Sequence, residues 1–423
     1  MDRLPENILS AQTGDELIQF INETKTKSNY ELKEIALSEQ EQWSILQGVL
    51  SHKSRGFFQV MGLKNRINPS DEKLMLYQPQ SALTGLIFFK SGDEIYTLLQ
   101  ARVEPGNSGI IQLGPTIQST PANYLQLHGG KATAYVENFT SFYPGCHLIW
   151  HSMQHDLGSK YYQKSKTHHY LLSTGPIATE ENMVWASLSS IQDVLLKDNL
   201  LNADLRSLLA VFDWDGFWQN GNNSSVNITV PEGDLSKLKK YEMTPLEDLK
   251  KWEVNSQGVK ALEGQASSVG MFHFSATNRE VKAWSQPLYK VEGQGLVQLL
   301  YTQESGELNF LVRFDHECGI STPIALYPSY LSTPEDPNPE SPFQVGETKY
   351  EIIQCDEGGR FFRNNSTYQV IQVEKKVPDT KGIWITSLEL RAYLNASNIC
   401  SFQLRCISSL VLHLLHPLSF DKK

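Results

Sequence analysis

The side chains best suited to chemistry stand close together in one polar run of the chain. The run opens with Glu104-Pro105-Gly106-Asn107 and continues to His128. Neutral hydrogen-bond donors and acceptors fill the space between, at Gln112, Thr116, Gln118, Ser119, Thr120, Asn123 and Tyr124. Gln112, Thr116, Gln118 and Thr120 share parity, so on an extended chain they would face one side. Such a face suits a ligand rich in hydroxyls and carbonyls, such as a sugar or a nucleobase.

The opening tetrapeptide has two interpretations. As a plain turn, Pro105 fixes φ, Gly106 takes a positive φ and Asn107 hydrogen-bonds its own backbone. As part of a site, the same turn aims Glu104 and Asn107 into a pocket. The polar run that follows the turn favours the second interpretation.

The same backbone signature occurs again 213 residues later, with less chemistry on it. Glu317-Cys318-Gly319-Ile320 matches the opening tetrapeptide, and Pro328-Ser329 and Ser332-Thr333-Pro334 match Pro115-Thr116 and Ser119-Thr120-Pro121. The side chains that do not recur are Asn107, Gln112, Gln118, Asn123 and Tyr124. What repeats should therefore be backbone geometry, and what is lost is amide and phenol chemistry. We expect the first copy to hold the working site.

Colinear matches of this kind run through the chain and predict a tandem duplication. Hairpins are expected over 85–103 and 296–314, and each copy closes with a Trp (Trp185, Trp384) before a helix led by Ser187 or Ser387. The predicted fold class is α+β: two modules, 1–212 and 245–423, each a mixed β-sheet packed with helices, the second degenerate. Residues 213–244, with the stretch Gly221-Asn222-Asn223-Ser224-Ser225, are expected to form a linker. A helical lead-in is predicted before each module, near 31–48 with Trp43 and over 245–253 with Trp252.

A glycine turn followed by a cation also occurs twice. Asp156-Leu157-Gly158-Ser159-Lys160-Tyr161 matches Asp356-Glu357-Gly358-Gly359-Arg360-Phe361. The backbone N–H groups of such a turn, helped by a nearby cation, can bind phosphate. Lys160 and Arg360 are therefore candidates for a phosphate site, and Tyr161 for stacking on a base. Solvated cations and alternating core aromatics explain the same residues without a ligand.

Composition narrows the class of protein. The 423 residues carry a net charge of −10, which argues against a general nucleic-acid binder and a protein of anionic membranes. We recognise no signal peptide, and no stretch approaches the roughly 20 apolar residues of a membrane span. The five cysteines are scattered without a Cys-x-x-Cys pair, which favours buried thiols in a reducing cytoplasm. His168 and His169 would face opposite sides of a strand, so no metal site is predicted.

Strings along nearly the whole chain are similar to those of one known family. They are His52, Ser54, Gly56–Leu63, Glu104–Asn107, Gln112–Thr120, Asn123-Tyr124, His128, Arg279-Glu280-Val281, Trp284–Leu288 and Asp356–Phe361. This set resembles the NDP-hexose 2,3-dehydratase family of deoxysugar biosynthesis. The resemblance implies Nudix-like topology in both modules, a homodimer, a dTDP-linked 4-keto-6-deoxyhexose as substrate and no cofactor. The Nudix hydrolase box is absent from both halves, so metal-dependent diphosphate cleavage is not expected.

The reaction that the resemblance implies removes water across C2 and C3 of the sugar. The C4 ketone acidifies the C3 proton, a base removes it, and the C2 hydroxyl leaves to give a 3,4-diketo-2,6-dideoxyhexose. The acid/base candidates are the titratable residues of the motif, Glu104, Tyr124 and His128, with the two roles open between them. The candidates for binding substrate are Asn107, Gln112, Thr116, Gln118, Thr120, Asn123, Lys160, Tyr161 and Arg360.

The second copy departs from the family pattern. Cys318 stands where the family tends to have Pro, Ile320 replaces a polar residue, and Leu331 stands where the first copy has Gln118. These changes argue against a second functional pocket. The alternatives are a non-catalytic nucleotide-sugar-binding homologue, a dehydratase or isomerase acting on a different nucleotide-linked substrate, and a Nudix-type hydrolase.

Overall fold

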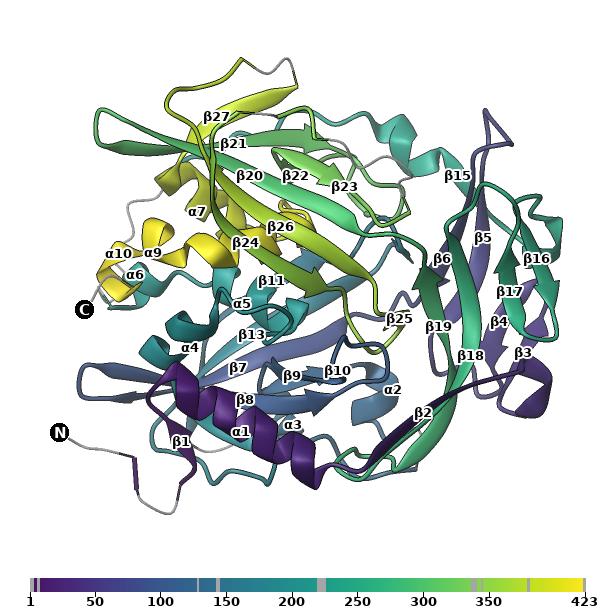
Figure 1. Cartoon of the computed structure of the whole chain (residues 1–423), viewed down its shortest axis with the longest axis horizontal. Coiled ribbons are helices and arrows are strands. Elements are labelled where there is room, and N and C mark those ends of the chain that lie inside the picture. The colour runs from purple at the N-terminus through teal and green to yellow at the C-terminus, as the bar shows by residue number, and fades with distance from the viewer. Residues whose placement is uncertain are drawn as a thin grey trace.

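Strands dominate the computed structural model, which describes residues 4–5, 8–127, 129–141, 145–218, 226–335, 341–343, 345–378 and 381–420. They form four sheets, two large and two smaller (Figure 1). Each sheet contains both parallel and antiparallel pairs. The expectation of mixed sheets packed with helices is confirmed, while the Nudix-like topology stays a prediction.

The two large sheets repeat one arrangement of strands. In the first half the order is β14 (Met183–Ser187), β8 (Glu94–Val103), β7 (Ala82–Ser91), β13 (Ser165–Ser173) and β11 (Cys146–His155), with β1 (Ser10–Ala11) on β14, β9 (Ile111–Gly114) on β8 and β10 (Ile117–Ser119) on β7. In the second half the order is β27 (Gly382–Thr386), β21 (Glu307–Asp315), β20 (Gly295–Glu304), β26 (Asn365–Gln372) and β24 (Glu347–Cys355), with β22 (Ala325–Pro328) on β21 and β23 (Tyr330–Ser332) on β20. Both predicted hairpins, β7–β8 and β20–β21, are confirmed.

The two smaller sheets repeat each other as well. One runs β12 (Tyr161–Tyr162), β6 (Glu72–Tyr77), β5 (Gln59–Asn65), β4 (Val49–His52), β3 (Trp43–Leu46), and the other runs β25 (Phe361–Phe362), β19 (Ala283–Val291), β18 (Ser267–Ala276), β17 (Gly258–Ala261), β16 (Trp252–Asn255). Each accepts one strand from the opposite half of the chain. β2 (Tyr30–Ile35) pairs with β18, and β15 (Tyr241–Thr244) pairs with β5. The two halves therefore exchange a strand.

This exchange changes the interpretation of the segments before each module. The expected helical lead-ins are wrong, because residues 30–35 and 43–46 are strands, as is Trp252–Asn255, and only the short 3₁₀ turns η1 (Leu37–Glu39) and η3 (Leu246–Asp248) are helical there. Pairing with a distant strand decides the conformation, and local periodicity cannot reveal that. The expected linker 213–244 contains α6 (Trp214–Trp218), η2 (Leu235–Lys239) and β15, while Gly221 to Ser225 lie outside the described residues. The exact module boundaries stay a prediction.

The helices begin at well-formed caps. α1 (Gly14–Lys27) has a capping box between Thr13 and Glu16, and Ser187 caps α4 (Leu188–Val194), as expected. In the second half Thr386, one residue before the expected Ser387, caps α7 (Ser387–Asn395). The remaining helices are α2 (Pro121–Tyr124), α3 (Val136–Thr140), α5 (Ala203–Val211), α8 (Phe402–Ser408), η4 (Ser409–Val411), α9 (Leu412–Leu415) and α10 (Pro417–Phe420). None of the described helices is long and apolar enough to cross a membrane.

The core joins the two halves through their matching helices α5 and α8. These helices pack on each other. In addition, α5 packs against β7 and β9, and α8 packs against β20, β22 and β26. Their repeated arginines are fully buried and reach into the opposite half. Arg206 Nε donates to Gln354 Oε1 at 2.7 Å, and Arg405 Nε donates to Ser207 Oγ at 2.8 Å. A hydrophobic cluster of the described residues likewise contains side chains from both halves, so the two halves share a core.

Candidate active site

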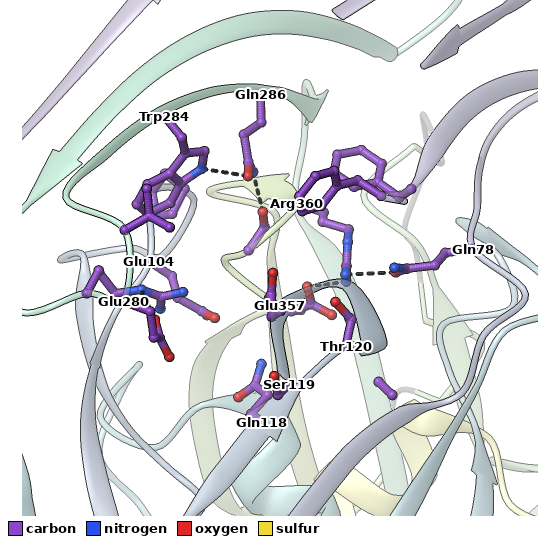
Figure 2. Close-up of a pocket in the computed structure, with 18 of the residues that line it drawn as sticks. Gln78, Glu104, Gln118, Ser119, Thr120, Glu280, Trp284, Gln286, Glu357 and Arg360 are labelled. Carbon is purple, nitrogen blue, oxygen red and sulfur yellow. Dashed lines mark hydrogen bonds and ion pairs between the residues drawn. The ribbon is translucent and has the colours of Figure 1, made fainter. Parts of the chain in front are cut away.

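A cavity of about 490 Å³ lies where the first-half strands β7, β8 and β10 meet the second half. The second half supplies two segments of its wall, residues 279–286 and the glycine turn 357–360. Figure 2 shows side chains from both halves pointing into the same space, with Glu357 near its centre. Neither half alone encloses this cavity.

The glycine turns hold the two halves in contact beside the cavity. Gly106 N donates to Gly358 O at 2.7 Å, and Arg363 N donates to Gly106 O at 2.7 Å. The second copy makes the reciprocal contact, since Gly319 N donates to Gly158 O at 2.8 Å and Gln163 N donates to Gly319 O at 2.6 Å. A Cβ on Gly106 would lie 1.7 Å from the Phe361 oxygen, and one on Gly319 would lie 1.8 Å from the Tyr161 oxygen. Both glycines are thus required by close approach of two backbones.

One wall of the cavity carries alternating carboxylates and guanidinium groups. Arg102 Nε donates to Glu104 Oε1 at 2.7 Å, and Arg279 Nε lies 3.3 Å from Glu280 Oε2. Glu104 also accepts a long 3.4 Å hydrogen bond from Asn107 Nδ2. Burial lowers the pKa of Arg102, but Glu104 and Glu280 outweigh burial and raise it. Two carboxylates, of Glu104 and Glu280, and two guanidinium groups, of Arg102 and Arg279, therefore lie side by side in the cavity wall.

The floor of the cavity is a second, more deeply buried charge cluster. Lys166 Nζ lies 2.6 Å from Asp204 Oδ1 and 3.3 Å from both Asp156 Oδ2 and Glu357 Oε2. Glu357 also accepts from Arg360 Nη1 at 2.7 Å, the ion pair drawn in Figure 2. Burial raises the pKa of Asp204, whereas for Glu357 burial is outweighed by Arg360 and Lys166, which lower the pKa. Within the cluster, Glu357 is therefore a fixed carboxylate, while the pKa of Asp204 lies above its usual range.

Arg360 joins this floor to an aromatic wall. Its guanidinium donates to Gln78 Oε1 at 2.8 Å and to the Tyr161 hydroxyl at 2.9 Å, and its carbon lies 5.3 Å from the Phe58 ring centre. Trp43 packs against Phe58, and His52 packs against both Trp43 and Phe57. Burial and Lys53 lower the pKa of His52, which favours a neutral ring. Flat rings beside a cation suit a base or a sugar face next to a phosphate.

Several of the predicted site residues meet at this cavity. Glu104, Gln118, Thr120, Asn123 and Arg360 all line it. Gln118 Oε1 accepts from Asn202 Nδ2 at 2.9 Å, and Asn202 also caps α5, so the amide of Gln118 is tied to the start of that helix. The polar run thus does build one wall of a pocket, as the sequence predicts.

Others serve the frame around the cavity. Thr116 Oγ1 accepts from Ile87 N and donates to Leu98 O, and in the second copy Ser329 makes the same pair of bonds with Leu300 and Leu311. Asn107 and Gln112 contact the Cys355 sulfur across the halves. Tyr124 packs beside the cluster that contains Leu83, Ile117 and Phe139. In the described chain, the residues that line the cavity do not include Asn107, Gln112, Thr116 or Tyr124.

Lys160 and Tyr161 also lie behind the cavity wall. Lys160 is 1% exposed and its Nζ is 2.5 Å from Asp356 Oδ2, so an internal ion pair already uses the charge expected to meet diphosphate. Tyr161 is buried, and its hydroxyl donates to Glu357 Oε2 at 3.3 Å. His128 lies outside the described residues, so its role stays a prediction.

Sequence reasoning assigned no role to several residues of this site. They are Arg102, Asp204, Arg279, Glu280, Trp284 and Glu357. Arg279-Glu280 and Trp284 stood in strings already used for the family resemblance, which was the available signal. Asp204 carried none, because it sits in an ordinary helix start. Among the described residues, no three His, Cys, Asp or Glu side chains are grouped so that they could hold a metal ion.

Comparison with known proteins shows which family this chain matches. Residues 14–212 and 236–411 match the family described as NDP-hexose 2,3-dehydratase. The chain is 26% identical to dTDP-4-dehydro-6-deoxy-alpha-D-glucopyranose 2,3-dehydratase of Saccharopolyspora spinosa, over 96% of this chain and 93% of that protein. It is 24% identical to the protein of the same name from Amycolatopsis orientalis, over 94% of this chain and 92% of that protein. The match covers both halves, including every segment that builds the cavity.

Proposed function

This chain belongs to the NDP-hexose 2,3-dehydratase family, and from that premise we propose that it removes water across C2 and C3 of a dTDP-linked 4-keto-6-deoxyhexose. The observation that carries the proposal is the Arg102–Glu104 pair in the cavity wall, 2.7 Å apart. The reaction takes a proton from C3 while negative charge develops on the oxygen of C4. A carboxylate and a cation side by side match two neighbouring atoms of the substrate.

In this proposal Glu104 is the base that removes the C3 proton. Its carboxylate lies in the cavity wall and is oriented by Arg102 and Asn107, which limits the geometries that it can adopt. Arg102, with Arg279 on the same wall, stabilises the enolate oxygen at C4. Holding the base and the cation in place before substrate binds lowers the cost of reorganisation in the transition state.

The nucleotide end of the substrate is assigned to the aromatic wall. Arg360 is a cation between Phe58 and the cavity floor, which suits a diphosphate, and the rings of Trp43, Phe57 and Phe58 suit a nucleobase. Relatives over nearly the full length are named for a dTDP-4-dehydro-6-deoxyglucopyranose, which supports this choice of substrate. Gln118, Thr120 and Asn123 would then bind sugar hydroxyls.

The test is turnover of dTDP-4-keto-6-deoxyglucose by the purified chain in D₂O. We expect a product lighter than the substrate by one water and carrying deuterium at C2. Tight binding of dTDP without loss of water would support the non-catalytic alternative, and release of phosphate compounds from the diphosphate would support a hydrolase. Light scattering of the same sample would test the homodimer that the family resemblance implies.

A further inference from the structure

We infer that Asp204 is the general acid that protonates the leaving C2 hydroxyl, and that Lys166 is the residue that positions it. The inference rests on the proposed dehydration and adds the acid that this reaction needs. Both side chains line the cavity, from strand β13 and the start of helix α5.

The start of α5 places Asp204 at the cavity floor. Asn202 caps the helix by accepting from Leu205 N, and its own amide donates to Gln118 Oε1 in the cavity wall. Asp204 is the second residue of the helix and is 2% exposed. The helix end is therefore anchored to the same wall that carries the proposed sugar contacts.

Lys166 uses its ammonium group to hold three carboxylates together. Asp204 Oδ1 is the nearest at 2.6 Å, and Asp156 and Glu357 lie at 3.3 Å. Lys166 itself is 2% exposed, and its ammonium lies 5.3 Å from the Phe402 ring centre. With its protons directed at these carboxylates, Lys166 is suited to fixing a neighbour and poorly suited to meeting a substrate.

The second oxygen of Asp204 is the observation that points to a ligand. Oδ2 is buried and has no hydrogen-bond partner among the described residues. A purely structural ion pair with Lys166 is complete through Oδ1, and a buried polar atom without a partner is costly. A proton on Oδ2 would need an acceptor, and a hydroxyl of a sugar in the cavity would supply one.

Burial and the neighbouring carboxylates favour that proton. The floor holds three carboxylates, Asp156, Asp204 and Glu357, with the cations Lys166 and Arg360, and Lys164 and Arg405 also act on these carboxylates. Burial raises the pKa of Asp204, and Glu357 and Asp156 add to the rise while Lys166 opposes it. A carboxyl group whose pKa is raised by burial and carboxylates but lowered by a lysine can be protonated before the reaction and charged after it, as a general acid must be.

The proton count closes over one turnover. Glu104 takes the C3 proton, the C2–O bond breaks, and the Asp204 proton leaves with the oxygen as water. The proton on Glu104 exchanges with solvent, and the enol becomes the ketone when Glu104 then delivers a proton, in D₂O a deuteron, to C2. The 3-hydroxyl proton of the enol returns to Asp204. No oxidant or reductant is needed, and both groups regain their starting state.

The variant Asp204→Asn tests the acid separately from the base. Asparagine keeps the shape and can still accept from Lys166, but it cannot donate a carboxyl proton. In D₂O with dTDP-4-keto-6-deoxyglucose, we expect water loss to fall by about 10²-fold or more. Exchange of the C3 proton for deuterium in unreacted substrate should persist, because Glu104 is untouched. Exchange without elimination is a readout that a merely structural role would not produce.

Asp215→Asn is the matched control, because Asp215 is another buried carboxyl whose pKa burial raises, and it is outside the cavity lining of the described chain. Its ratio of exchange to elimination should stay as in the wild type. Unchanged elimination in Asp204→Asn, or equal loss of exchange and elimination with the fold intact by circular dichroism, would overturn the acid while leaving the dehydration standing. A wild-type chain that shows neither exchange nor elimination would overturn the proposed function and the acid with it.

Discussion

The two Glu-x-Gly turns of the chain make the same contact and carry different chemistry. Around Gly106 and Gly319 each turn bonds to the glycine turn of the opposite half, at 2.7 Å and 2.8 Å. Glu104 is held by Arg102, whereas Asp315 stands at the position matching Arg102 and Glu317 is hydrogen-bonded by Tyr327 at 3.4 Å. Burial raises the pKa of Glu317 to about 7, even though Tyr327 and Lys160 oppose the shift.

The two copies therefore share the backbone contact of Gly106 and Gly319 with the opposite half, and they differ in the polar side chains around it. The repeated glycines are fixed by backbone contact, which both copies need for the halves to stay together. The polar groups around them are free to change, since Ile320 replaces Asn107 and Leu331 replaces Gln118. One copy presents a paired carboxylate to a cavity, and the other holds its carboxyl beside Tyr327 and Lys160.

The largest expected contrast is between Glu104→Gln and Glu317→Gln. Loss of the proposed base should reduce turnover by about 10²- to 10⁴-fold, while Glu317→Gln should stay within about threefold of the wild type. The measurement is steady-state water loss from dTDP-4-keto-6-deoxyglucose, with circular dichroism to show that both variants fold. Equal losses would mean that the two copies are equivalent in chemistry.

Substitution of the two contact glycines should affect both copies equally, unlike the substitution of the two glutamates. Gly106→Ala and Gly319→Ala each force a Cβ against a carbonyl oxygen, so each should lower the free energy of unfolding by about 3 kcal/mol or more. Gly175→Ala is the control, because a Cβ there meets nothing within 4 Å. Urea unfolding measures the free energy of unfolding of all three variants. A Gly319→Ala variant as stable as the wild type would show that the second copy does not need this glycine contact.

The half-buried Glu317 carboxyl of the second copy predicts a dependence of stability on pH. Because its folded pKa of about 7 exceeds its usual 4.5, its contribution is fully present below 4.5 and is lost as pH rises through 7. Glu317→Gln removes that loss, so the variant should gain on the wild type by up to about 3 kcal/mol between pH 4.5 and 8. Parallel stability curves across this range would show that the pKa of Glu317 is not raised in the folded chain.

The smallest expected effect concerns the amide that the second copy lacks. Gln118→Leu copies Leu331 into the first half and should raise KM by about tenfold, the loss of roughly one hydrogen bond. The reverse change, Leu331→Gln, should leave KM as it is. If both variants bound substrate like the wild type, Gln118 would belong to the frame alone, through its bond to Asn202.

Local patterns predicted the elements well, and long-range contacts decided the rest. The hairpins and the duplication follow from periodicity and repetition. The exchange of β2 and β15 does not, because it depends on strands some 180 to 240 residues away. The same reason explains Gly106: the sequence predicted a positive φ, but the described backbone shows no positive φ there and the glycine is fixed by Phe361.

The lining of the candidate site was predictable where one segment carries it. Glu104, Gln118, Thr120 and Asn123 come from one polar run and share one wall. Lys160 pairs with Asp356, and Tyr124 packs beside apolar side chains, so neither lines the cavity of the described chain and their predicted roles stay predictions. Asp204 and Glu280 reach the cavity from distant segments, and spacing along the chain cannot show that.

The most direct test of the working copy is a crystal structure of the chain with dTDP. We expect nucleotide in the first-half cavity and none beside Glu317, with the diphosphate at Arg360 and the base against Trp43, Phe57 and Phe58. Nucleotide bound only beside Glu317 would contradict the account, because the chemistry would then lie in the copy that has lost its amides.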